Sequence, residues 1–107
     1  MSHDSPVARR QVEVTNALGL HFRPADKFVQ LARQFESEIR VGVAADGQVM
    51  NGKSILDLVG LAAERGTRLD LEAQGPDAEA AVAALAGLVI AQFYETEDGQ
   101  EQAPHPG

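Results

Sequence analysis

The stretch GLHFRPA, residues 19–25, holds the side chains best suited to chemistry. His21 carries an imidazole, which can act as a general base or as a nucleophile that accepts a phosphoryl group. Arg23 adds a guanidinium that can bind phosphate oxygens through two hydrogen bonds. Both precede a run with helical periodicity, and the first turn of a helix presents unpaired N–H groups and the positive end of the helix dipole. The motif therefore predicts an anion site, with phosphate as the favoured anion.

The residues around His21 suit such a site. Pro24 falls in the first helical turn, where its missing N–H costs nothing and its fixed φ favours the helix. A general base needs a companion nucleophile or metal, and the sequence supports no Ser/His/Asp set. His3 and His105 have no metal-ligand spacing with His21, so no metal site is expected. A cap histidine without any chemistry remains the alternative.

A second candidate site is NGKSIL, residues 51–56. Ser54 and Asp57 form an S-x-x-D capping pattern, which predicts that a helix begins after Ser54. The same region matches the phosphate-binding pattern G-x-x-x-x-G-K-S at Gly47, Gly52, Lys53 and Ser54. A true loop of that kind follows a buried parallel strand in a larger α/β domain. The pair Asp46-Gly47 instead predicts a hairpin turn, so nucleotide hydrolysis is disfavoured.

The apolar pattern predicts the elements that position these sites. Alternation predicts strands around Val12 and Val14 and over 39–43, 48–51 and 69–73. Helical spacing predicts helices over 22–35, from 54 to near Gly66, and over 78–93. The resulting order, β-α-β-β-α-β-α, indicates an α+β fold: an open-faced β-sandwich with a four-stranded antiparallel sheet and three helices on one face.

Composition narrows the class of protein. The chain has 107 residues, a formal net charge of −7 and no cysteine. The length fits one domain, expected over 9–94, with disordered tails at 1–8 and 95–107. The negative charge disfavours nucleic acid and membrane surfaces as partners. No apolar run can span a bilayer, and the lack of cysteine fits a reducing compartment, so a cytoplasmic protein is expected.

GLHFRPA resembles the active-site motif of the histidine-containing phosphocarrier proteins (HPr) of the phosphoenolpyruvate-dependent phosphotransferase system, and the element order is similar to that family's fold. The resemblance runs from about Gln11 to about Phe93. It implies a carrier, and no enzyme in its own right, that takes a phosphoryl group on Nδ1 of His21 from phosphorylated enzyme I. The acceptor would be a downstream protein or permease domain, as in sugar transport. Arg23 would stabilise the phosphate. No cofactor is implied, and a monomer is expected.

The resemblance also implies a regulatory site and a docking surface. Ser54 stands at the position of the serine that HPr kinase/phosphorylase modifies in the family, and a phosphate on an N-cap residue is compatible with the helix dipole. An exposed apolar docking patch is expected between the first two helices, formed by Phe22, Ile55, Leu56 and Val59. Core packing is the alternative for Ile55 and Val59.

Two acidic residues depart from the family's pattern. Asp26 either faces His21, where it would compete with phosphate for the helix terminus, or points away and only caps the helix. Asp57 stands where family members often carry a basic docking residue. With the acidic net charge, these residues keep a second hypothesis open: a regulatory or nitrogen-related HPr-like docking module that controls partner proteins rather than sugar uptake.

Overall fold

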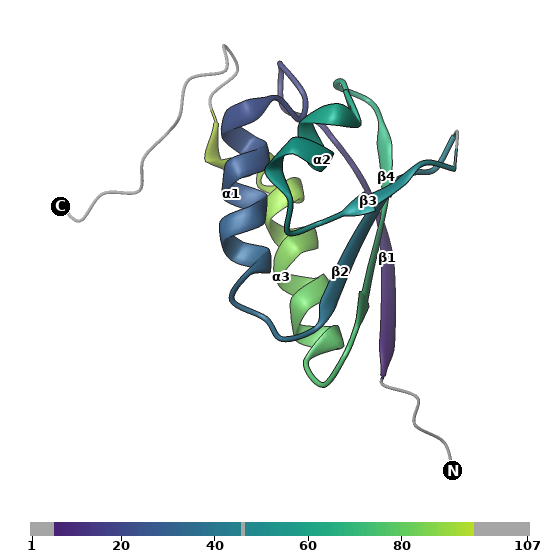
Figure 1. The fold of residues 1–107 in the computed structure, drawn as a ribbon. Helices are drawn as coiled ribbons and strands as arrows, with labels where there is room; N and C mark the ends of the chain where they lie inside the picture. The colour runs from purple at the N-terminus through teal and green to yellow at the C-terminus, as the bar shows by residue number, and fades with distance from the viewer. Residues whose placement is uncertain (1–5, 46, 96–107) are drawn as a thin grey trace, which may run out of the picture.

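The computed structural model describes residues 6–45 and 47–95. The elements are β1 (Val7–Glu13), α1 (Phe22–Ala32), β2 (Glu38–Val43), β3 (Val49–Asn51), α2 (Ile55–Gly60), β4 (Arg68–Gln74), α3 (Ala78–Ile90) and the short turn η1 (Gln92–Tyr94). The four strands form one antiparallel sheet in the order β1-β4-β2-β3. All three helices lie on the same side of this sheet (Figure 1). The predicted α+β open-faced fold and its element order are confirmed.

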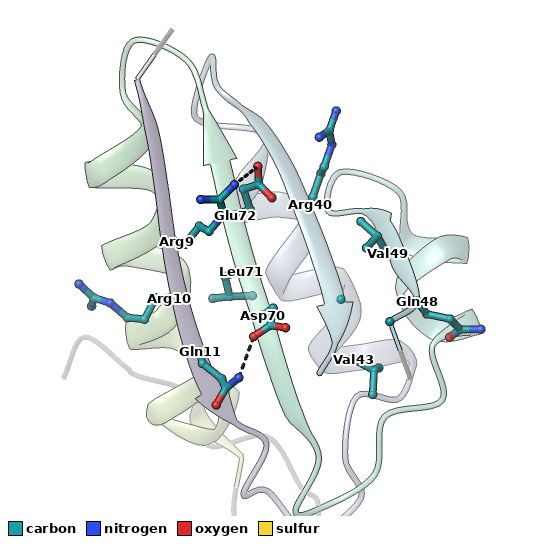
Figure 2. Close-up of a pocket in the computed structure, with 12 residues that line it drawn as sticks. Arg9, Arg10, Gln11, Arg40, Val43, Gln48, Val49, Asp70, Leu71 and Glu72 are labelled. Carbon is teal, nitrogen blue, oxygen red and sulfur yellow. Dashed lines mark hydrogen bonds and ion pairs between the residues drawn. The ribbon is translucent and has the colours of Figure 1, made fainter. Parts of the chain in front are cut away.

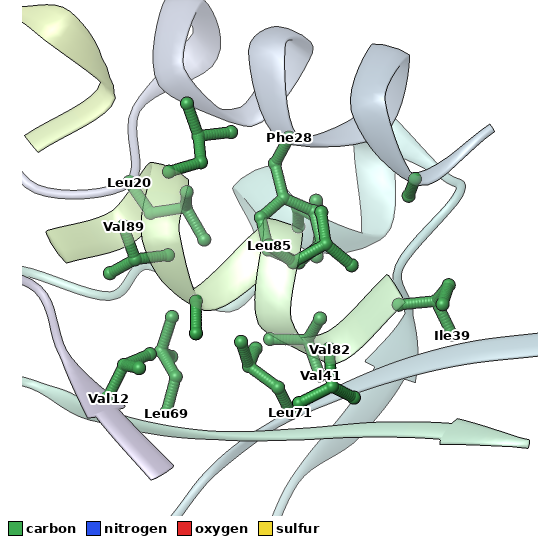
Figure 3. Close-up of a cluster of buried hydrophobic side chains, with 14 of the residues drawn as sticks. Val12, Leu20, Phe28, Ile39, Val41, Leu69, Leu71, Val82, Leu85 and Val89 are labelled. Atoms are coloured by element: carbon green, nitrogen blue, oxygen red, sulfur yellow. The ribbon is translucent and has the colours of Figure 1, made fainter. Parts of the chain in front are cut away.

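The core lies between the sheet and the helices (Figure 3). Because side chains alternate along a strand, Leu69, Leu71 and Ala73 of the central strand β4 all point toward the helices and are buried. The register places Val41 opposite Leu71. From the helical layer, Phe28 of α1 and Leu85 of α3 reach down to the same cluster, and each is no more than 1% exposed. Aliphatic packing against one sheet face therefore fixes α1, whose first turn carries the GLHFRPA motif.

Element ends differ from the apolar pattern in a consistent way. The helices end at Ala32, Gly60 and Ile90, before the predicted limits at 35, near Gly66 and at 93. Phe35 still packs against the core and Phe93 is fully buried, although both lie beyond their helices. The apolar pattern therefore overestimates the length of the helices, because a buried residue just after a helix can continue the helical spacing of apolar residues. Ala62 cannot continue α2, since its φ is +53°.

The chain ends of the domain also differ from expectation. Strand β1 begins at Val7, and Ala8 is buried opposite Ala73, so two residues of the expected tail belong to the sheet. Glu95, the first residue of the other expected tail, is buried as well. The remaining tail residues, 1–5 and 96–107, lie outside the described residues, as does Asp46 of the predicted turn. Gly47 has a φ of +73° in that turn.

Within residues 6–45 and 47–95, none of the helices has the length and apolar character needed to cross a bilayer.

Asp77 joins the start of α3 to the turn that follows α1. Its carboxylate accepts hydrogen bonds from the Ser37 hydroxyl at 2.5 Å and from the N–H groups of Glu36 and Ser37 at 2.9 Å each. The Ser37 hydroxyl, and after it the Glu36 N–H, lowers the pKa of Asp77 below its ordinary value of 3.8. The charged form of Asp77 is thus the one that stabilises the fold.

Asp77→Asn should lower the urea midpoint at neutral pH, because an amide is a weaker acceptor for these three donors. The depressed pKa means that the contribution is present above about pH 4 and is lost as the pH falls through the lowered value. The difference between the wild-type and variant midpoints should therefore shrink in acid. Asp70→Asn is the control, since the hydrogen bond that the Asp70 carboxylate accepts from Gln11 lies at the surface. A pH-independent difference would contradict this account.

Candidate functional site

His21 is the N-cap residue of α1. Its backbone is extended, with φ −83° and ψ −168°, and its side chain makes no capping hydrogen bond. Ala25 N–H donates to the His21 carbonyl at 3.0 Å, while Pro24 has no N–H. The N–H groups of Phe22 and Arg23 are therefore the ones that the first turn presents at its end. Because the imidazole does not cap the helix, it is available for another contact.

The loop before α1 is held by its own backbone and by a neighbouring loop. The Asn16 side chain donates to the Gly19 carbonyl at 2.8 Å, and Leu20 N–H donates to the Ala63 carbonyl at 2.7 Å. Leu20 is buried. Gly19 has a φ of +72°, and a Cβ there would lie 2.4 Å from the Ala63 carbonyl oxygen. Glycine is thus required twice, by its backbone conformation and by the close approach of the second loop.

Gly19→Ala should therefore destabilise the fold more than Gly47→Ala does. Both glycines have nearly the same φ, but a Cβ on Gly47 would meet nothing within 4 Å. Gly47→Ala should cost about 1 kcal/mol of unfolding free energy for the left-handed backbone alone. Gly19→Ala should cost about 2 to 4 kcal/mol, because rigid backbone must also move. Urea unfolding of both variants measures the difference, and equal losses would rule out the close approach as the cause.

Glu95 is the site residue that sequence reasoning missed. Its side chain is fully buried, and its Oε2 lies 3.3 Å from Nε2 of His21, whose side chain is 34% exposed. Its Oε1 accepts from the Asn16 amide at 2.9 Å. The ring is not aligned for a hydrogen bond, so Nε2 and Oε2 have no hydrogen-bond partner within the described part of the chain. Two buried polar atoms this close, one a potential donor and one an acceptor, are each other's natural partners.

An unusual turn brings Glu95 to this place. Gln92, Phe93 and Tyr94 all have positive φ, between 55° and 61°. Consecutive left-handed residues other than glycine each cost about 1–2 kcal/mol, so the surroundings must hold them. Phe93 is fully buried in the core, and the Gln92 amide donates to Thr15 Oγ1 at 3.2 Å. The turn reverses the chain after α3 and places the Glu95 side chain beside His21.

The predicted docking residues fall into two groups. Phe22 is 65% exposed, Leu56 79% and Val59 37%, whereas Ile55 packs against the core. They lie on α1 and α2, which are neighbours in the helical layer (Figure 1). Leu18, in the loop before His21, is a further apolar side chain, 60% exposed, that the pattern did not single out. Arg23 is exposed as well.

The acidic residues have partners of their own. The Asp26 carboxylate accepts from the Gln30 amide at 3.4 Å, one turn further along α1, so the alternative in which it points away from His21 agrees with the structure. The predicted cap of α2 is confirmed, because Asp57 N–H donates to Ser54 Oγ at 3.2 Å. The Asp57 carboxylate accepts in turn from Asn51 N–H at 3.2 Å.

The exposed face of the sheet carries a shallow hollow of about 520 Å³. It lies over the strands, away from α1, and none of the predicted site residues lines it (Figure 2). Two of its charged side chains, Arg9 of β1 and Glu72 of β4, form an ion pair across strands at 3.6 Å. Among the described residues there is also no cluster of three or more His, Cys, Asp or Glu that could hold a metal ion. The candidate functional site therefore lies at the start of α1.

Comparisons with known proteins identify the family and support the fold. The family described as "PTS HPr component phosphorylation site" matches residues 8–91. Phosphocarrier protein HPr of Neisseria meningitidis is 44% identical over 89 residues, 83% of this chain and 98% of that protein. A multiphosphoryl transfer protein of Vibrio cholerae is 45% identical over 83 residues, 77% of this chain but 21% of that protein. The crystal structure of HPr-C-His from Thermoanaerobacter tengcongensis superposes with a TM-score of 0.78 at 38% identity, covering 83% of this chain and 98% of that one.

Proposed function

The chain belongs to the HPr family of phosphocarrier proteins of the phosphotransferase system. On that premise we propose that Nδ1 of His21 accepts a phosphoryl group from phosphorylated enzyme I and passes it to a downstream acceptor of the same system. It acts as a carrier that is itself phosphorylated and dephosphorylated once per transfer, alongside these partners in the cytoplasm. One observation carries this proposal: the half-exposed His21 ring at the start of α1, with Nε2 turned toward the buried Glu95 carboxylate.

The position of Glu95 supports Nδ1 as the acceptor atom. A carboxylate oxygen can only accept a hydrogen bond, so the proton of a neutral ring belongs on Nε2, and a small rotation of the ring aligns it with Oε2. Nδ1 then carries the lone pair. Since Nε2 is buried, the exposed part of the ring lies on the side that a partner protein can reach. The nitrogen that is chemically ready is thus also the accessible one.

The transfer itself needs no further reactant. The Nδ1 lone pair of His21 attacks phosphorus in phosphorylated enzyme I, the new N–P bond forms, and the bond between phosphorus and the donor nitrogen breaks. The Nε2 proton stays beside Glu95 throughout. The N–H groups of Phe22 and Arg23, the Arg23 guanidinium and the positive end of α1 stabilise the phosphate. Delivery to the acceptor is the same exchange in the opposite direction.

The apolar docking patch, defined as Phe22, Leu56 and Val59, suits the recognition of these partners. Exposed apolar side chains beside a reactive group exclude water once a partner covers them and hold the two phosphoryl sites in line. Ile55 supports the patch from below, since it packs against the core. The patch would therefore serve donor and acceptor in turn, because both must reach the same ring.

Ser54 is the regulatory part of the proposal. Its hydroxyl accepts the Asp57 N–H and so caps α2, directly before Ile55 and Leu56. A phosphate added by a kinase such as HPr kinase/phosphorylase would keep the capping role, since the N-terminus of a helix favours negative charge. It would also bring that charge next to the docking patch. Phosphorylation of Ser54 would thus act mainly on partner binding and less on the stability of the domain.

The direct test incubates the protein with phosphoenolpyruvate and purified enzyme I and follows its intact mass before and after acid. The proposal requires a gain of one phosphoryl group that acid removes, because the P–N bond of phosphohistidine is labile at low pH and a phosphoserine is not. A folded protein that gains no phosphate, while the same enzyme I phosphorylates the N. meningitidis HPr, would refute the carrier function.

A further inference from the structure

We infer that Lys27 is a positioning residue for His21: by holding the C-terminal turn, residues 92–95, it keeps the Glu95 carboxylate beside Nε2 and so selects Nδ1 as the phosphoryl acceptor. The inference deepens the proposed function, because the choice of ring nitrogen matters only if the ring accepts phosphate. It rests on contacts among described residues of α1, the loop before it and the chain after α3.

The first step is that the C-terminal turn needs an external support. Gln92, Phe93 and Tyr94 are left-handed, and this stretch contains no glycine that would adopt such a backbone without strain. Inside the turn, Glu95 N–H donates to the Gln92 carbonyl at 3.0 Å, and Tyr94 N–H donates to the Ala91 carbonyl at 3.0 Å. Two local hydrogen bonds do not compensate for three strained residues. The turn therefore depends on what packs against it.

Lys27 supplies the strongest polar contact with the turn. Its Nζ donates to the Phe93 carbonyl at 2.6 Å, and the side chain is partly buried. A hydrogen bond from an ammonium is about twice as strong as one between neutral groups. Two further polar contacts of the turn are longer and have neutral donors: Gln92 to Thr15 at 3.2 Å and Asn16 to Glu95 at 2.9 Å. Removal of the ammonium should thus weaken the turn more than the loss of either of these contacts.

The second step connects the turn with the ring. Lys27 is six residues after His21 in the chain, and its hydrogen bond to the Phe93 carbonyl connects it with the turn that carries Glu95. When the turn opens, Glu95 leaves, and nothing then ties the proton to Nε2. The ring becomes free to carry its proton on either nitrogen. Part of the protein would then present a protonated Nδ1, which has no lone pair for phosphorus.

The test compares Lys27→Met with Lys53→Met. Lys53 is a matched control, because its Nζ also donates to a backbone carbonyl, that of Phe35, at 2.7 Å, and it is likewise partly buried. Two quantities are measured on the unphosphorylated full chain by NMR: hydrogen exchange at the Tyr94 and Glu95 amides, and the nitrogen shifts of the His21 ring. Glu95→Leu provides the ring spectrum without the carboxylate, and Lys27→Arg tests rescue.

Lys27→Met should speed exchange at both amides by about tenfold to a hundredfold, the effect of losing one charge-assisted hydrogen bond. It should also move the ring shifts toward those of Glu95→Leu. Lys27→Arg and Lys53→Met should change neither quantity. The inference is wrong if Lys27→Met exchanges like Lys53→Met. It is equally wrong if exchange rises while the ring shifts stay unchanged, since Lys27 would then be structural only. Neither readout uses a phosphoryl donor, so this failure is distinct from failure of the carrier function.

Discussion

Replacing His21 by alanine should abolish phosphate uptake from enzyme I. The ring supplies the nitrogen lone pair that bonds to phosphorus, whereas the Arg23 guanidinium and the N–H groups around it can bind a phosphate only through hydrogen bonds. Intact mass should show no acid-labile phosphoryl group on His21→Ala. The chain has two other histidines, His3 and His105, which remain in this variant. They serve as an internal control, because phosphate that persisted would have to lie on one of them.

His21→Gln is the companion variant that separates chemistry from folding. Alanine leaves the buried Glu95 Oε2 without its neighbour, which costs stability, whereas a glutamine amide can donate to that oxygen. Both variants should lose phosphate uptake, but His21→Gln should keep a urea midpoint nearer to that of the wild type. Uptake that survives in His21→Gln would contradict the assignment of His21 as acceptor.

The same variants also separate the two functional hypotheses. A carrier loses its output when His21 is replaced, whereas a docking module would keep both its partner and its effect on that partner. Binding of His21→Gln to enzyme I, measured by calorimetry, should stay close to wild type, because the docking patch lies outside the ring. An intact downstream effect without phosphate would favour the docking module.

The double variant Phe22→Ser/Leu56→Ser should lower the affinity for enzyme I by roughly a hundredfold. Central apolar anchors of an interface commonly contribute about 2 kcal/mol or more each, and their effects are not fully additive. These two side chains are 65% and 79% exposed, so their loss should change the unfolding free energy by less than about 1 kcal/mol. Calorimetric titration with enzyme I measures the first quantity, and urea unfolding measures the second.

Val49→Ser is the matched control for this pair. Val49 is 61% exposed, but it lines the hollow on the opposite, helix-free face of the sheet (Figure 2). Its replacement should leave the affinity for enzyme I unchanged. If Val49→Ser weakened binding as strongly as the double variant, the partner would have to contact the sheet, and the docking patch on α1 and α2 would be wrongly placed.

Local sequence signals were sufficient for the fold and for the reactive end of α1. Periodicity located the three α-helices and the strands β1, β2 and β4, because one buried face imposes a period of 2 or 3.6 on the chain, and the Asp46-Gly47 turn signal located β3. The Ser54–Asp57 cap could be predicted, since both partners lie within one helical turn. The ends of α1 and α3 could not be predicted in this way, because Phe35 and Phe93 pack in the core although they lie beyond these helices.

The order of the elements and the place of His21 and Arg23 at a helix N-terminus can thus be predicted from the sequence, since both follow from neighbours a few residues apart. The position of Glu95 depends on tertiary packing: this residue, in what the sequence indicated as a tail, lies 3.3 Å from His21. That contact needs a left-handed turn of three residues that are not glycine, and no residue type in this stretch predicts such a turn. Its strain is offset by the burial of its own Phe93 in the core and by the ammonium of Lys27, which is distant in the chain and donates to the Phe93 carbonyl.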